Sequence, residues 1–131
     1  MTILRRYVSI GLLPSIALGA ISAIPAYHLE MMFVVCPLFL VAVIEETCKY
    51  LLFRATDRSM ASAFLVGFGF SLMENILFIS YNPSLQYAIS RFGFPVLVHT
   101  ICTLFFAYGM ENKEYKYPVI AVAIHWIYDL Y

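Results

Sequence analysis

At residues 41–53 the chain reads VAVIEETCKYLLF, a stretch that places three charged side chains in an otherwise apolar run. These side chains are Glu45, Glu46 and Lys49. A charge at the centre of a bilayer costs roughly 2.5–3.5 kcal/mol on insertion scales, so such a group of charges needs partners inside the protein. The stretch therefore predicts a helix whose polar face is covered by the rest of the chain.

The composition of the chain is that of an integral membrane protein. Of its 131 residues, 63% are hydrophobic and 12% are charged, and the mean hydropathy is +0.84. Soluble domains average about 25% charged residues. No basic patch with interleaved aromatic residues occurs, so no nucleic-acid partner is predicted. Cys36, Cys48 and Cys102 lie in apolar runs without CxxC spacing, and we interpret them as small buried residues.

Five apolar runs predict an all-α bundle of transmembrane helices in a single domain, 1–131. The helices are expected at 7–27, 31–53, 60–80, 92–110 and 117–131. The first run has about 20 residues, more than the roughly 7–15 residues in the apolar region of a signal peptide, so we expect it to be retained as a helix. His28 and Glu30 are expected in the connection after it. Pro37 is expected to kink the second helix, and Ser59 to cap the third.

The basic residues predict the orientation of this bundle. With the N-terminus in the cytoplasm, one basic residue, Arg91, falls outside. The cytoplasmic side then holds Arg5, Arg6, Arg54, Arg58, Lys113 and Lys116. The excess of positive charge on the cytoplasmic side is the arrangement that membrane insertion favours. A multi-pass protein with a cytoplasmic N-terminus is therefore expected, in contact with the lipid bilayer.

Isolated ionisable residues recur in the later runs at similar depth. Counted at roughly 1.5 Å per residue from the cytoplasmic helix ends, they lie about 12–21 Å into the membrane. They are Glu45, Glu74, His99, His125 and Asp129. Such groups should face the interior of the bundle and pair with one another. A carboxylate beside a histidine can activate water, and two imidazoles with a carboxylate can bind zinc, so both chemistries stay open.

A stripe of small residues lies on the same face as Glu74. Ala63, Gly67 and Ser71 form a small-xxx-small pattern that lets another helix approach closely. This face, together with the short last run that stops soon after Asp129, predicts association into a homo-oligomer.

Four motifs together resemble the PrsW-type membrane proteases. They are Glu45-Glu46-x-x-Lys49, Phe70-x-x-x-Glu74-Asn75, His99 at the start of HTICTLFFAYG, and His125-x-x-x-Asp129, in this order within residues 41–131. These proteases are similar to the larger superfamily of CAAX prenyl endopeptidases and bacteriocin-processing (Abi) enzymes. The prenyl endopeptidases have histidine where this chain has Glu74, so Glu74 and Asn75 favour the PrsW side.

The resemblance implies a membrane-embedded endopeptidase of a prokaryotic cell membrane. Its expected substrate is a membrane protein or lipidated peptide, and site-1 cleavage of a single-span protein such as an anti-sigma factor is the expected reaction. Glu45 would activate the water with help from the histidines. His125 and Asp129 would hold the oxyanion or the water, and Glu46 and Lys49 would form a structural ion pair or a supporting contact.

The resemblance leaves the metal open. If Zn²⁺ takes part, its expected ligands are Glu74, His99 and His125, and Asn75 has a supporting role. Two other functions are compatible with the same residues. The first is a catalytically silent scaffold subunit, because the superfamily resemblance extends to such a subunit of a presenilin-type protease complex. The second is a proton or ion carrier. A buried polar network that only fixes helix register is the purely structural alternative.

Overall fold

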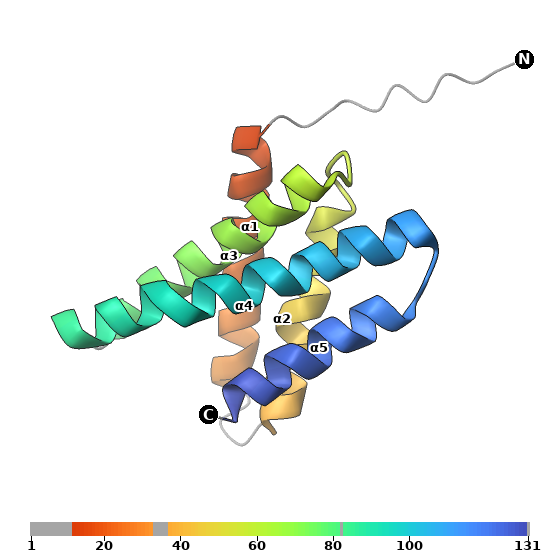
Figure 1. Cartoon of the computed structure of the whole chain (residues 1–131). Helices are drawn as coiled ribbons and strands as arrows, with labels where there is room; N and C mark the ends of the chain where they lie inside the picture. The colour runs from red at the N-terminus through yellow and green to blue at the C-terminus, as the bar shows by residue number, and fades with distance from the viewer. Residues whose placement is uncertain (1–11, 33–36, 82, 131) are drawn as a thin grey trace, which may run out of the picture.

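The computed structural model describes residues 12–32, 37–81 and 83–130, which fold into five α-helices (Figure 1). The helices are α1 (Leu12–Met32), α2 (Leu38–Phe53), α3 (Met60–Tyr81), α4 (Leu85–Asn112) and α5 (Lys116–Asp129). The predicted all-α class is confirmed for this part of the chain. By length and composition, α3 and α4 could each cross a membrane, and α1 holds a shorter apolar segment, Leu13–Leu29.

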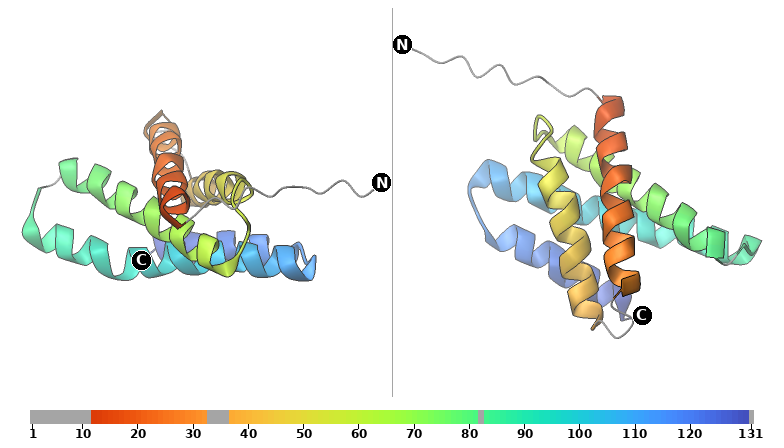
Figure 2. Two further views of the ribbon diagram at one scale, coloured as in Figure 1. Left: turned by 90° about the horizontal axis from the view of Figure 1, so that it is seen from above. Right: turned by 180° about the vertical axis from the view of Figure 1, so that it is seen from behind.

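The helices are arranged in two crossing layers. Helices α1 and α2 run side by side, and α3, α4 and α5 cross them in the second layer in sequence order (Figures 1 and 2). Helix α3 packs on α1, and α5 packs on α2. Because α2 contacts all four other helices, its charged stretch is covered from several sides, as the sequence predicts.

Helix α1 is longer at its C-terminal end than predicted. It passes through Pro25 and ends at Met32, so His28 and Glu30 lie within the helix and the expected connection over them is wrong. A proline inside a helix removes one backbone hydrogen bond, which neighbouring helices can compensate for in a membrane. Residues 7–11 of the predicted first helix lie outside the described residues.

Helix α2 begins after Pro37, which precedes the helix and does not kink it. Proline fits a helix start because its φ angle is already near the helical value and the first amide groups need no partner. Residues 33–36 of the predicted helix, including Cys36, lie outside the described part of the chain. Ser59 is confirmed as a cap of α3, because its Oγ accepts a hydrogen bond from the Ser62 backbone nitrogen at 3.1 Å.

Helix α4 starts seven residues earlier than predicted. Ser84 caps it by accepting a hydrogen bond from the Tyr87 backbone nitrogen at 3.1 Å, so the polar residues after Ser84 form a helical turn and not a loop. Arg91 consequently lies inside α4, and its predicted place in the connection before that helix is wrong. Helix α5 carries Pro118 in its first turn, as predicted.

Glycines bring α3 close to its neighbours. A Cβ atom on Gly67 would lie 2.7 Å from the His99 carbonyl oxygen and 2.8 Å from the Thr100 Cα atom of α4. A Cβ atom on Gly69 would collide with the Ile16 carbonyl of α1. The predicted close approach is thus confirmed, but the neighbour is α4 of the same chain. The Gly67 face is therefore already covered and no longer supports a homo-oligomer.

An apolar core fills the region where α2, α3, α4 and α5 meet. Its fully buried members include Phe53, Val66, Cys102 and Phe106. The interpretation of Cys102 as a small buried residue is confirmed, and its thiol donates a hydrogen bond to the Ala121 carbonyl at 3.3 Å. The core does not cover one end of the polar face of α2, and a separate cluster of charged groups lies there.

Candidate functional site

Six buried ionisable side chains from four helices meet in one cluster. Glu45, Glu46 and Lys49 come from α2, Glu74 from α3, His99 from α4 and His125 from α5. Asp129 lies at the edge, with 15% of its side chain exposed. The predicted convergence of these groups is confirmed. It follows from the cost of leaving any of them alone in an apolar interior.

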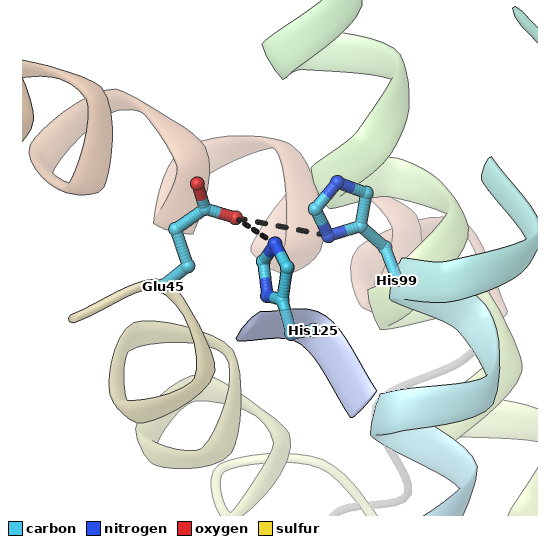
Figure 3. A group of neighbouring side chains, drawn as sticks. All are labelled: Glu45, His99 and His125. Atoms are coloured by element: carbon cyan, nitrogen blue, oxygen red, sulfur yellow. Dashed lines mark ion pairs between the residues drawn. The ribbon is translucent and has the colours of Figure 1, made fainter. Parts of the chain in front are cut away.

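His125 lies between three carboxylates. Its Nδ1 atom is 2.6 Å from Glu46 Oε1, while its Nε2 atom is 3.4 Å from Glu45 Oε2 and 3.5 Å from Asp129 Oδ1. An ionised carboxylate only accepts hydrogen bonds, so Nδ1 donates to Glu46. In the neutral imidazole Nε2 then carries the lone pair, and this atom faces Glu45 (Figure 3).

His99 is held on its opposite edges by Lys49 and Glu74. Its Nδ1 atom is 3.0 Å from Lys49 Nζ and 3.7 Å from Glu45 Oε2. An ammonium group only donates, so Nδ1 is the acceptor and the ring proton lies on Nε2. Nε2 is 2.5 Å from Glu74 Oε2, a close contact without hydrogen-bond alignment. The rings of His99 and His125 meet edge to face, with centroids 4.8 Å apart.

Lys49 is fully buried and forms an ion pair with Glu46 one turn earlier in α2. The predicted Glu46–Lys49 pair is therefore confirmed. Its ammonium also lies 4.7 Å from the centroid of the Phe70 ring, which adds a cation–π contact. Lys49 thus links α2 to both α3 and α4.

Arg91 is the site residue that sequence reasoning missed. Its Nη2 atom donates to Glu74 Oε1 at 2.7 Å and its Nε atom donates to Asn75 Oδ1 at 3.2 Å. The Asn75 amide in turn donates to the Arg91 carbonyl at 2.8 Å, so Asn75 reaches the cluster through Arg91, and its supporting role stays a prediction. The guanidinium also lies 4.4 Å from the Phe78 ring centroid. The signal that could have found Arg91 is the capping serine, Ser84, which extends α4 over it.

The contacts also change the charge balance of the cluster. Sequence reasoning sets one cation, Lys49, against four carboxylates. In the described structure Arg91 is a second cation in contact with these groups. With neutral histidines the cluster therefore carries two net negative charges in place of three.

The geometry of the cluster agrees only in part with the predicted zinc site. Glu45, His99 and His125 each offer one ligand atom, and these atoms lie within 4.8 Å of one another. This spacing can admit a zinc ion, which binds nitrogen and oxygen at about 2.0–2.2 Å. The predicted set contains Glu74, which instead faces the other nitrogen of His99. Because the Lys49 ammonium already donates to His99 Nδ1, the set fits zinc by spacing but not with Lys49 in place.

Comparisons of the chain with protein-family models, with curated proteins and with solved structures find no match. The resemblance to PrsW-type proteases therefore stays a prediction based on the four motifs, and the site is interpreted from its own geometry.

Proposed function

We propose that the chain is a membrane-embedded endopeptidase that hydrolyses a peptide bond at the Glu45–His125 pair. The observation that carries this proposal is the position of His125, whose Nδ1 is held by buried Glu46 while its Nε2 faces Glu45 Oε2 at 3.4 Å. A carboxylate on one imidazole nitrogen fixes the tautomer and keeps a lone pair available on the other, as in hydrolytic triads. A second carboxylate beside that lone pair supplies a base for water.

The distribution of side chains supports a location in a membrane. The three charged residues of α2, Glu45, Glu46 and Lys49, are at most 3% exposed. Large apolar side chains that are 65–79% exposed include Leu13, Leu85, Ile89, Phe94 and Val119. Water-soluble proteins rarely bury charge this way, whereas a helix bundle in lipid does so for function. Arg54 and Lys113 line one cavity, so two of the basic connections share one end of the bundle, in keeping with a cytoplasmic N-terminus.

Hydrolysis would use the groups on either side of one water molecule. Glu45 takes a proton from the water as its oxygen attacks the carbonyl carbon of the substrate. The same proton then passes to the amine nitrogen as the carbon–nitrogen bond breaks. His125 Nε2 accepts the second hydrogen of the water and holds it in place. Asp129, the most exposed member of this group, marks the side from which the substrate enters.

The surroundings of the site favour an apolar substrate segment. Between α4 and α5 lies an apolar groove of about 570 Å³, lined by Phe94, Val98, Ile124, Ile127 and Tyr128. The ring of Tyr128, which lines the groove, has its centroid 6.3 Å from that of the His125 ring, so the groove adjoins the cluster. A single-span membrane protein or a lipidated peptide would present the apolar segment that such a groove binds.

The proposal is tested by reconstituting the full chain in liposomes with a pool of single-span peptides and identifying the products by mass spectrometry. We expect cleavage by the wild type and by His28→Gln, which changes an exposed histidine of α1. His125→Gln should lose at least about 100-fold of the rate, the usual contribution of acid–base catalysis. Absence of cleavage by the wild type, or full activity of His125→Gln, would contradict the proposal.

The same liposomes separate the alternatives. A proton carrier would change the pH inside vesicles that hold a pH-sensitive dye, without any peptide product. A scaffold would show neither cleavage nor flux. We expect cleavage without flux.

A further inference from the structure

We propose that the Lys49 ammonium is the resident cation of the Glu45–His99–His125 group. In the wild type it excludes divalent metal ions, and its removal opens a zinc site on these three residues. The inference rests on the contacts of the cluster and is independent of the proposed hydrolysis.

The first argument is the lone pair of His99. Its Nδ1 atom faces Glu45 Oε2 at 3.7 Å, and Lys49 Nζ lies 3.0 Å from the same nitrogen. A neutral imidazole has one accepting nitrogen with one lone pair, which can bind either an N–H donor or a metal ion. Lys49 is fully buried and held by Glu46 and the Phe70 ring, so its ammonium stays on this nitrogen.

The second argument is charge. A zinc ion on His99 Nδ1 would stand within a few ångströms of the ammonium, and two cations at that separation in a water-poor interior repel strongly. With Lys49 present the cluster has two net negative charges. Without Lys49 it has three, which a divalent cation reduces to one. Loss of the lysine alone thus removes the repulsion and leaves a net negative charge that favours binding of a divalent cation.

The third argument is that the rest of a zinc site is already built. The ligand atoms come from three helices, and the two distances from Glu45 Oε2 are 3.4 Å to His125 Nε2 and 3.7 Å to His99 Nδ1 (Figure 3). Each histidine faces a carboxylate with its other nitrogen, namely Glu46 for His125 and Glu74 for His99. Carboxylate–histidine–zinc arrangements of this kind orient the ligands of known metal sites.

The test compares metal binding by the full chain and two variants. Lys49→Met keeps a long unbranched side chain beside Phe70 but removes the charge. The double variant Lys49→Met/Glu46→Gln also removes the carboxylate that loses its lysine, and its amide oxygen can still accept from His125. Lys116→Met, on the exposed start of α5, is the matched control. Thermal unfolding in detergent shows which variants are folded.

Zinc uptake is measured by equilibrium dialysis and cobalt binding by its visible absorption. We expect no saturable binding by the wild type or Lys116→Met, and saturable binding of one equivalent by the folded Lys49 variants. Adding Glu45→Gln to the double variant should abolish that binding. One equivalent of zinc in the wild type would overturn the proposal, and so would a folded double variant that binds no more than the wild type.

Discussion

His125 Nδ1 lies 2.6 Å from Glu46 Oε1, so the second glutamate of the adjacent pair orients the imidazole that faces the first. Glu45 and Glu46 point in directions about 100° apart on α2, and one ring on α5 bridges them. This relationship gives Glu46 a second role beside its ion pair with Lys49.

Glu46→Gln should lower cleavage through the chemical step. The neutral amide holds the His125 Nδ1–H group less strongly than the carboxylate does, so the ring orients the water less well, and we expect kcat to fall at least about 100-fold with little change in KM. Glu111→Gln, an exposed change at the end of α4, is the control. Kinetics on one cleavable peptide check this, and a change confined to KM would contradict the positioning role.

Substitutions of Lys49 and Glu46 should have non-additive effects on the free energy of unfolding. Lys49→Met leaves a buried carboxylate without its cation and should lower the free energy of unfolding by about 3–5 kcal/mol. The double variant Lys49→Met/Glu46→Gln removes both charges and should be more stable than Lys49→Met alone. Denaturant unfolding in mild detergent measures both. Equal or greater loss in the double variant would show that the charges do not depend on each other.

Arg91→Gln should destabilise the α3–α4 contact. It removes the cation that donates to Glu74 at 2.7 Å and leaves that carboxylate with His99 alone, at a cost of about 2–5 kcal/mol. Arg91→Lys should recover part of the loss at most, because lysine cannot contact Glu74 and Asn75 with one planar group. Arg54→Gln, on an exposed residue, is the control. The free energy of unfolding is measured for each variant, and equal values for Arg54→Gln and Arg91→Gln would contradict the prediction.

Gly67→Ala and Gly93→Ala should have opposite effects. The new Cβ at Gly67 would press on the His99 carbonyl at 2.7 Å and force α3 and α4 apart, which costs about 1–3 kcal/mol. At Gly93 nothing lies within 4 Å of the new Cβ, so alanine should stabilise α4 by about 1 kcal/mol through helix propensity. Melting temperatures of the two variants check the prediction. Destabilisation of the same size by both would contradict it.

The convergence of four helices at Glu45, Glu74, His99 and His125 could be predicted from the sequence, because buried charged groups need partners inside the protein. The Glu46–Lys49 pair follows from helical spacing in the same way. The choice of Glu45 as the carboxylate between the two histidines could not be predicted. An imidazole has nitrogens on two edges, and the one that meets Glu74 depends on how α3 and α4 are rotated against each other.

The position of Arg91 could not be predicted from the sequence for a different reason. Gln86 and Ser90 make the segment before it polar, which is typical of a loop, but Ser84 caps this segment as a helix by accepting a hydrogen bond from the Tyr87 backbone nitrogen. A positive charge counted as external thereby becomes the partner of Glu74. A local capping signal, more than hydropathy, decides this part of the site.

The most direct test of the central claim is to measure peptide cleavage and unfolding free energy on the same preparation of Glu45→Gln. Glutamine is less costly to bury than a carboxylate and reduces the negative charge of the cluster. We therefore expect the unfolding free energy to stay within about 0.5 kcal/mol of the wild type or to rise, while cleavage falls at least about 100-fold. A variant that keeps its cleavage rate, or that loses it only as far as it unfolds, would show that Glu45 supports the fold and not the chemistry.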